Sequence, residues 1–244
     1  MHGEKVLIGL SGGINSMAVL CWLHESGIVP SELHLYYAHF QEHSPDTYPF
    51  VRDGIRFARK NFQNVHVKVT RTSVIRFFGE QKMIPHPIQS PCSRLLKIVP
   101  ITKYAVDNGI EHDLVGYVKQ ELKRRTARQK PVADAALKKH YPIGAFDDDW
   151  CFEIVDRYIG WHPAIYDIKS ADGKRTFKHN NCLPCKNMDV RDMEKVKAHF
   201  PEYHAEAMAL TDRLGKYWGR DKDNFYSTFG RDLGQDSTCK DCVW

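Results

Sequence analysis

The chain has 244 residues, of which 42% are hydrophobic, 27% are charged and 11% are aromatic. This composition is ordinary for a soluble globular protein, and it excludes disordered, collagen-like and disulfide-dense classes. The sequence has neither a run of about 18 apolar residues nor a signal-peptide pattern at its start. We therefore expect a cytoplasmic protein that does not span a membrane.

The net charge of +5 is unevenly distributed. The segment 119–140 holds eight basic and two acidic residues, a net charge of +6, so the rest of the chain has a net charge of −1. One basic segment on a nearly neutral body indicates a local anion site rather than a broad nucleic-acid surface. The alternative is a solvated helix face.

The first two-thirds of the chain alternates short apolar runs with amphipathic ones, which predicts strands alternating with helices. Such alternation is typical of an α/β fold with a doubly wound parallel sheet, in which ligands lie at the carboxyl ends of the strands. In chain order, the expected elements are strand Lys5–Leu10, helix Asn15–Ser26, strand Leu33–Ala38, helix Asp46–Asn61, strand Val65–Val69, helix Ser93–Asn108 and strand Asp113–Gly116.

The character of the sequence changes near residue 145. We expect a helix over Asp147–Tyr158, a turn-rich stretch over Lys169–Lys178, and two helices over Asp189–Phe200 and Pro201–Tyr217. The predicted organisation is therefore a nucleotide-binding domain over 1–145 and a small helical, cysteine-containing region over 146–244.

A glycine-rich turn stands between the first predicted strand and the first predicted helix. It reads Ser11-Gly12-Gly13-Ile14-Asn15-Ser16. We expect both glycines to adopt left-handed backbone angles and to permit close approach to a phosphate, and the helix that follows directs free N–H groups and a positive dipole end at the same place. The serines can add hydroxyl donors, so the pattern favours a phosphate-binding loop over a simple tight turn.

This turn resembles the SGG-x-D-S pyrophosphate loop of the N-type ATP pyrophosphatases, also called PP-loop or adenine nucleotide alpha hydrolase-like proteins. Asn15 stands where that family usually has Asp. The resemblance implies a Rossmann-like sheet and binding of ATP with Mg²⁺.

Further segments resemble the phosphoadenosine phosphosulfate (PAPS) reductase-like branch, and together they cover residues 4–188. They are His43–Val51, Pro91–Pro100, Gly116–Arg125, Tyr141–Trp150 and Tyr166 with Cys182-x-x-Cys185. The resemblance implies nucleotide contacts from Ser11, Gly12, Gly13, Asn15, Ser16, His39, Gly116 and Glu121, and catalytic roles for Ser16, Lys97, Arg124 and Arg125.

The residue types and their places in the sequence also bear on four of these positions. Arg124 and Arg125 follow the fourth strand, and guanidinium groups suit bidentate phosphate or sulfate binding. Lys97 either faces this site or is an exposed helix residue. His39 ends the second strand, near the expected adenosine, with a surface or core role as the alternative.

The seven cysteines argue against a secreted disulfide framework because their number is odd. Two C-x-x-C pairs predict a metal site of four thiolates from Cys182, Cys185, Cys239 and Cys242. Zn²⁺ is the first choice and an iron–sulfur cluster the alternative, because relatives use the Cys92 and C-x-x-C positions for cluster ligation. Free thiols are the remaining reading, and Cys21 and Cys151 are expected to be buried.

Three functions remain open. The first is an ATP pyrophosphatase that adenylates a substrate, releases pyrophosphate and allows sulfur or nitrogen insertion, with nucleic acid or a sulfur-carrier protein as partner and a homodimer as one option. The second is a sulfonucleotide reductase that attacks PAPS with Cys239 or Cys242. The third is a non-catalytic nucleotide-binding protein.

Overall fold

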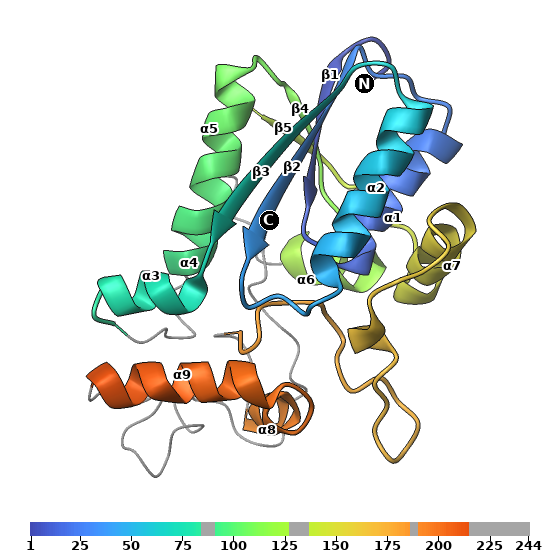
Figure 1. The fold of residues 1–244 in the computed structure, drawn as a ribbon. Helices are drawn as coiled ribbons and strands as arrows, with labels where there is room; N and C mark the ends of the chain where they lie inside the picture. Colours follow the sequence, from blue (N-terminus) through green and yellow to red (C-terminus); the bar gives the residue numbers. More distant parts are fainter. Residues whose placement is uncertain (84–90, 127–136, 186–189, 215–244) are drawn as a thin grey trace.

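The computed structural model describes residues 1–83, 91–126, 137–185 and 190–214. Its centre is a parallel sheet with the strand order β3-β2-β1-β4-β5 (Figure 1). The strands are β1 (Lys5–Leu10), β2 (Glu32–Phe40), β3 (Val65–Thr72), β4 (His112–Leu114) and β5 (Lys138–His140).

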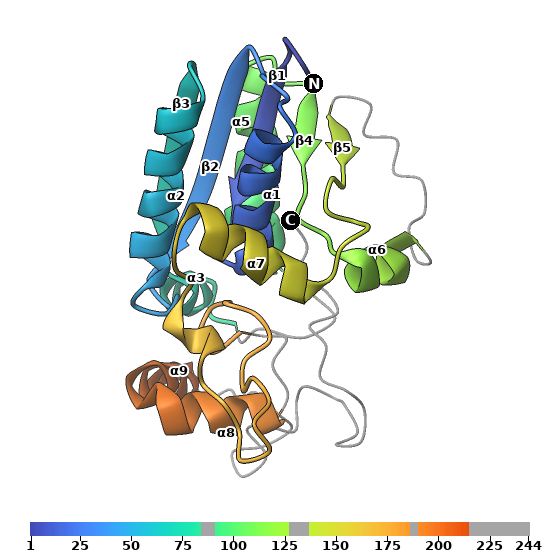
Figure 2. The same ribbon diagram turned by 90° about the vertical axis from the view of Figure 1, so that its right-hand side faces the viewer.

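Helices cover both faces of the sheet, so the predicted α/β doubly wound class is confirmed (Figure 2). One face carries α1 (Ile14–Glu25), α2 (Thr47–Asn61) and α7 (Asp148–Tyr158). The opposite face carries a continuous helical segment made of α4 (Pro91–Ser93), the π-helical η1 (Arg94–Ile98) and α5 (Val99–Asp107). The carboxyl ends of the strands face α3 (Val74–Glu80), α6 (Lys119–Thr126), the short η2 (Ala164–Tyr166), α8 (Val190–His199) and α9 (Pro201–Leu214).

The predicted elements agree with these bounds to within a few residues. The strand Lys5–Leu10 is confirmed at both ends, and the predicted helix over 93–108 is confirmed as η1 and α5. Five short elements of the described residues were not predicted, namely α3, α4, α6, β5 and η2. The strand β5 has the sequence Lys-Lys-His, which lacks the apolar alternation by which a strand is predicted.

The core forms because the central strand is buried on both faces. Val6, Leu7, Ile8 and Leu10 of β1 are fully or almost fully buried. Cys21 and Cys151 are also fully buried, as expected. The cluster on the α1 face includes residues from both sides of position 145, while the predicted domain boundary there stays a prediction.

The strand order determines where a crevice opens at the carboxyl ends of the strands. From β1 the chain proceeds outward to β2 and β3, and it then crosses to the other side of β1 to form β4 and β5. Loops after β1 and β4 therefore leave in opposite directions, and a crevice opens between the carboxyl ends of these strands, where ligands bind in such sheets. None of the helices in the described part of the chain has the length and apolar composition needed to cross a bilayer.

Candidate functional site

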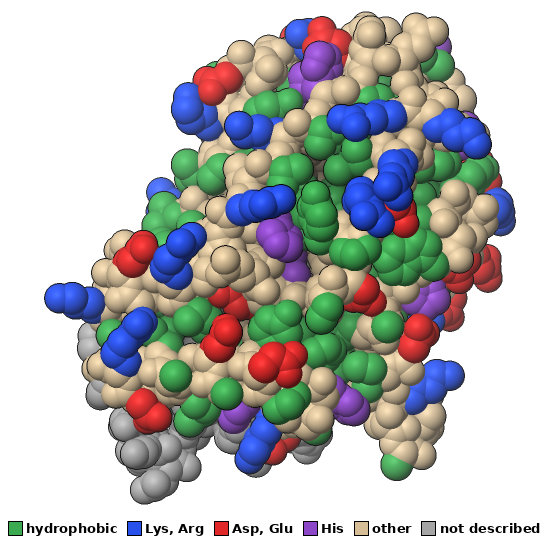
Figure 3. Space-filling view, in the orientation of Figure 1, with side chains coloured by type: hydrophobic (Ala, Val, Ile, Leu, Met, Phe, Trp, Pro, Cys, Tyr) green, Lys and Arg blue, Asp and Glu red, His purple; other side chains and the backbone are tan. Residues whose placement is uncertain are grey.

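A pocket occupies the crevice between the carboxyl ends of β1 and β4. Figure 3 views the molecule from the β3 edge of the sheet, where Lys and Arg side chains lie beside hydrophobic and histidine side chains, and the crevice between β1 and β4 lies behind this face. Four chain segments line the pocket, and they are the turn after β1, the loop after β4, the α4–η1 helix and the segment 178–185. Among the predicted site residues, the lining includes Ser11, Gly13, Asn15, Ser16, Lys97, Gly116, Glu121, Cys182 and Cys185.

The two glycines of the turn have different conformations. Gly12 has φ +80°, in the left-handed region that favours glycine, and a Cβ there would lie 2.2 Å from Thr47 Cγ2. Gly13 has φ −88° and ψ 161° and is the N-cap of α1. The expectation that both glycines adopt left-handed angles is therefore wrong for Gly13. Its lack of a side chain instead leaves room beside Ser11 Oγ and Tyr166 OH, each 3.3 Å from a Cβ built there.

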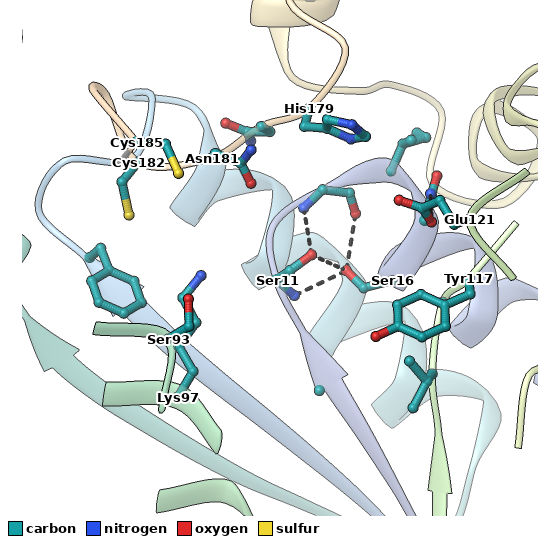
Figure 4. Close-up of a pocket in the computed structure, with 18 of the residues that line it drawn as sticks. Ser11, Ser16, Ser93, Lys97, Tyr117, Glu121, His179, Asn181, Cys182 and Cys185 are labelled. Atoms are coloured by element: carbon teal, nitrogen blue, oxygen red, sulfur yellow. Dashed lines mark hydrogen bonds between the residues drawn. The ribbon is translucent and has the colours of Figure 1, made fainter. Parts of the chain in front are cut away.

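The two serines close the turn on itself (Figure 4). Ser16 Oγ accepts the Ser11 backbone N–H at 3.0 Å and donates to the Gly13 carbonyl oxygen at 3.0 Å. Ser11 Oγ lies 3.0 Å from Ser16 Oγ and accepts the Gly13 N–H at 3.2 Å. These bonds hold the first turn of α1, with its N–H groups and positive dipole end, against the pocket.

A second layer of buried polar groups fixes the turn from behind. The Tyr166 hydroxyl accepts the backbone N–H groups of Ile14 and Asn180, both at 3.2 Å, and burial raises the pKa of Tyr166 to about 12, so the phenol is neutral. Asn180 Nδ2 donates to the Gly12 carbonyl oxygen at 3.0 Å and to Thr47 Oγ1 at 2.8 Å. Sequence reasoning did not assign a site role to Asn180 or Tyr166, although Tyr166 lies in a matched motif.

The loop after β4 packs directly on the first turn of α1. A Cβ at Gly116 would lie 2.9 Å from the Asn15 carbonyl group, so only glycine permits this approach. Asn15 Nδ2 donates to Glu121 Oε2 at 3.4 Å. Asn15 Oδ1 is buried and has no hydrogen-bond partner among the described residues. This oxygen can accept a bond from a bound hydroxyl or from a hydrated cation.

Three thiols line the same pocket on the other side of the turn, and Figure 4 shows two of them, Cys182 and Cys185. They belong to Cys92, Cys182 and Cys185, and none is in a disulfide. Burial raises the pKa of the Cys182 thiol well above its usual range; the positive charge of Lys97 opposes this shift, while Cys185 and Cys92 add to it. Lys97 Nζ lies 4.9 Å from the centroid of the Phe40 ring, at the side of the pocket where the sulfur atoms lie.

Five of the other predicted site residues are not assigned to the pocket. His39 is outside the pocket lining, and its Nδ1 lies 3.0 Å from the Tyr37 hydroxyl on the α1 face of the sheet. The side chains of Arg124 and Arg125, and all of Cys239 and Cys242, lie outside the described residues. Their roles, including the four-cysteine metal site, stay predictions.

No family model and no curated protein matches the chain. Among solved structures, it is similar to the PAPS reductase from Candida auris in a phosphate complex (15% identity, 66% of this chain and 76% of that chain, TM-score 0.45). It is also similar to the U34-tRNA thiolase NcsA from Methanococcus maripaludis with its [4Fe-4S] cluster (12% identity, 100% of this chain and 82% of that chain, TM-score 0.48). Both TM-scores are below 0.5, so the fold class rests on the sheet topology.

Proposed function

We propose that the chain is an ATP pyrophosphatase of the PP-loop type that adenylates a substrate and so prepares it for sulfur insertion. The observation that carries this proposal is the composition of one pocket. Its wall combines a glycine turn at a helix N-terminus, which suits phosphate, with three thiols, which suit sulfur chemistry.

The turn 11–16 supplies the binding of the leaving group. Pyrophosphate placed at the first turn of α1 meets backbone N–H groups and the positive end of the helix dipole. A substrate oxygen attacks the α-phosphorus of ATP, the bond to the bridging oxygen of the β-phosphate breaks, and pyrophosphate leaves with its negative charge stabilised there. Lys97 adds a positive charge to the pocket wall. Mg²⁺ would enter with ATP, and Asn15 Oδ1, which has no hydrogen-bond partner among the described residues, would be available to accept a bond from its water shell.

The thiols supply a place for sulfur or for a sulfur-ligated group. Cys92, Cys182 and Cys185 offer three soft ligands around one cavity, the donor set that iron–sulfur clusters and zinc accept. We propose that these three residues would hold an iron–sulfur cluster, which would supply a binding place for the sulfur donor. The four-cysteine zinc site is the competing arrangement.

The acceptor belongs to the same proposal. The basic segment 119–140 begins with α6, directly after the strand β4 that borders the pocket. Its net charge of +6 suits a local phosphate group, which a nucleic-acid acceptor carries next to each nucleoside, so we propose nucleic acid as the acceptor.

The test compares products and binding in full-length protein. We expect pyrophosphate release from ATP when total cellular RNA and a sulfide source are present, and no sulfite from PAPS. Calorimetry should give at least a tenfold loss of ATP affinity in Gly13→Val, because the branched side chain crowds Ser11 Oγ and Tyr166 OH, and unchanged affinity in the distant control Gly27→Val.

Each other outcome has a definite meaning. Sulfite without pyrophosphate would replace the proposal with the reductase alternative. Tight ATP binding with neither product would favour the non-catalytic protein. A visible absorption spectrum with elemental analysis separates iron from zinc, and equal ATP affinity in Gly13→Val and wild type would remove the phosphate-loop assignment.

A further inference from the structure

A second cluster of ligating side chains lies at the opposite end of the sheet. Glu32 and His34 are two residues apart at the amino end of β2, so their side chains are on the same face. The register of the neighbouring strand pairs His34 with His66 of β3. Three side chains of metal-binding type therefore meet on the face that α5 covers, roughly 25 Å along the strand from the pocket at its carboxyl end.

The distances between the ligating atoms suit a single small ion. Glu32 Oε2 lies 3.0 Å from His34 Nε2 and 3.6 Å from His66 Nε2, and all three atoms lie within 4.8 Å of one another. A tetrahedral Zn²⁺ with bonds of about 2.0–2.1 Å requires ligand atoms about 3.4 Å apart. The two imidazole rings are stacked with their centroids 4.7 Å apart and their planes at 15°, so both Nε2 atoms are directed at the same carboxylate.

Neighbouring groups already orient the ligands. His34 Nδ1 lies 3.0 Å from the Tyr104 hydroxyl of α5. This hydroxyl can accept a hydrogen bond from Nδ1–H, which leaves the Nε2 lone pair for an ion. Lys5 Nζ lies 3.0 Å from Glu32 Oε1, the carboxylate oxygen that does not face the histidines. The structure therefore holds one ligand nitrogen and one ligand oxygen in place from outside the cluster.

The exposure of the three side chains increases from His34 to His66, which leaves a path for an ion to enter. The His34 side chain is 2% exposed, whereas Glu32 is 29% exposed and His66 is 53% exposed. An ion can reach the site from the His66 side, and solvent water can fill the fourth position.

We propose that Glu32, His34 and His66 form a binding site for a divalent transition-metal ion of the zinc class. Two imidazole nitrogens and one carboxylate oxygen are a borderline ligand set that Zn²⁺ prefers to Mg²⁺ or Ca²⁺. The ion links the edge strand β3 to β2, and through Lys5 and Tyr104 it is coupled to β1 and α5. Its role is structural, because the site is at the end of the sheet remote from the phosphate turn.

The experiment uses full-length protein without a histidine tag, dialysed against ZnCl₂ and then against buffer. Because thiolates are also ligands for Zn²⁺, the measure is a difference in zinc content between variants. We expect His66→Ala and Glu32→Gln to contain one equivalent of zinc per chain less than wild type. The exposed His199 on α8 provides the control, and His199→Ala should retain the full content.

Two further readouts make the test independent of stoichiometry. Zinc should shift the ¹⁵N resonances of His34 and His66 Nε2, and it should raise the melting temperature of wild type but not of His66→Ala. The exposed position of His66 keeps its alanine variant folded, and Glu32→Gln preserves the shape of its side chain. Equal zinc content in all variants, or unshifted imidazole resonances, would overturn the site.

Discussion

Replacing Gly12 with alanine is the sharpest test of how the glycine turn 11–16 is packed. Gly12 has φ +80°, and the left-handed conformation costs an L-residue about 1–2 kcal/mol. The added Cβ would also lie 2.2 Å from Cγ2 of the fully buried Thr47. Crowding of this kind typically costs about 1–3 kcal/mol, so the expected loss of folding free energy is about 2–5 kcal/mol.

Gly27→Ala is the matched control. Gly27 has φ +68°, but a Cβ there meets no atom within 4 Å. It carries the conformational cost alone, and the entropy that alanine removes from the unfolded chain is the same in both variants. The difference between the two variants is therefore the cost of displacing Thr47, about 1–3 kcal/mol.

The assay is urea unfolding followed by circular dichroism, with the free energies compared at equal m-values. Displacement of Thr47 also disturbs Asn180, which bonds both Thr47 and the Gly12 carbonyl oxygen, so ATP affinity should fall in Gly12→Ala and remain unchanged in Gly27→Ala. Equal destabilisation of the two variants would refute the claim that the turn is packed directly on Thr47.

Three further outcomes follow from individual contacts. Asn180→Ala should lower the free energy of unfolding by about 1–3 kcal/mol in urea, because buried partners of its amide lose their bonds. Lys97→Met should raise the pKa of the Cys182 thiol further, because the lysine charge lowers this pKa. The midpoint pH for alkylation of Cys182 should therefore move upward. The control Lys103→Met, which changes an exposed side chain, should leave that midpoint unchanged. Burial raises the pKa of Asp113 from 3.8 to about 6, so the native state binds the proton more tightly than the unfolded state. The free energy of unfolding should therefore fall by about 2 kcal/mol as pH rises from 4 to 6. Asp113→Asn should abolish that fall in urea titrations, and a wild-type stability that is flat across this window would contradict it.

The parts of the fold that sequence patterns predict are those with strong local signals. The strand Lys5–Leu10 is a continuous apolar run beside a glycine turn, and both its ends were predicted correctly. The strand β5 has no apolar residue, and it is paired because its position next to β4 supplies the backbone bonds. A strand of three residues that is held by pairing with its neighbour has no hydrophobic periodicity from which it could be predicted.

The site also has a part that the sequence predicts and a part that it does not. The turn 11–16 could be recognised because its residues are contiguous and their chemistry is local. Asn180 could not, because its function depends on meeting Gly12 and Thr47 across long sequence separations. The left-handed angle at Gly12 alone, rather than at both glycines, likewise depends on the packing of Thr47 against the turn.

The bond between Asn180 and Gly12 has a consequence for synthesis of the chain on the ribosome. The two residues are 168 positions apart, so the glycine turn 11–16 emerges from the ribosome long before the Asn180 amide that fixes it. At 5–20 residues per second this interval is roughly 10–30 s. The nascent chain thus exposes a complete glycine turn that has neither its buried amide nor the thiols of Cys182 and Cys185, and ligand competence begins only when translation has passed the C-x-x-C pair.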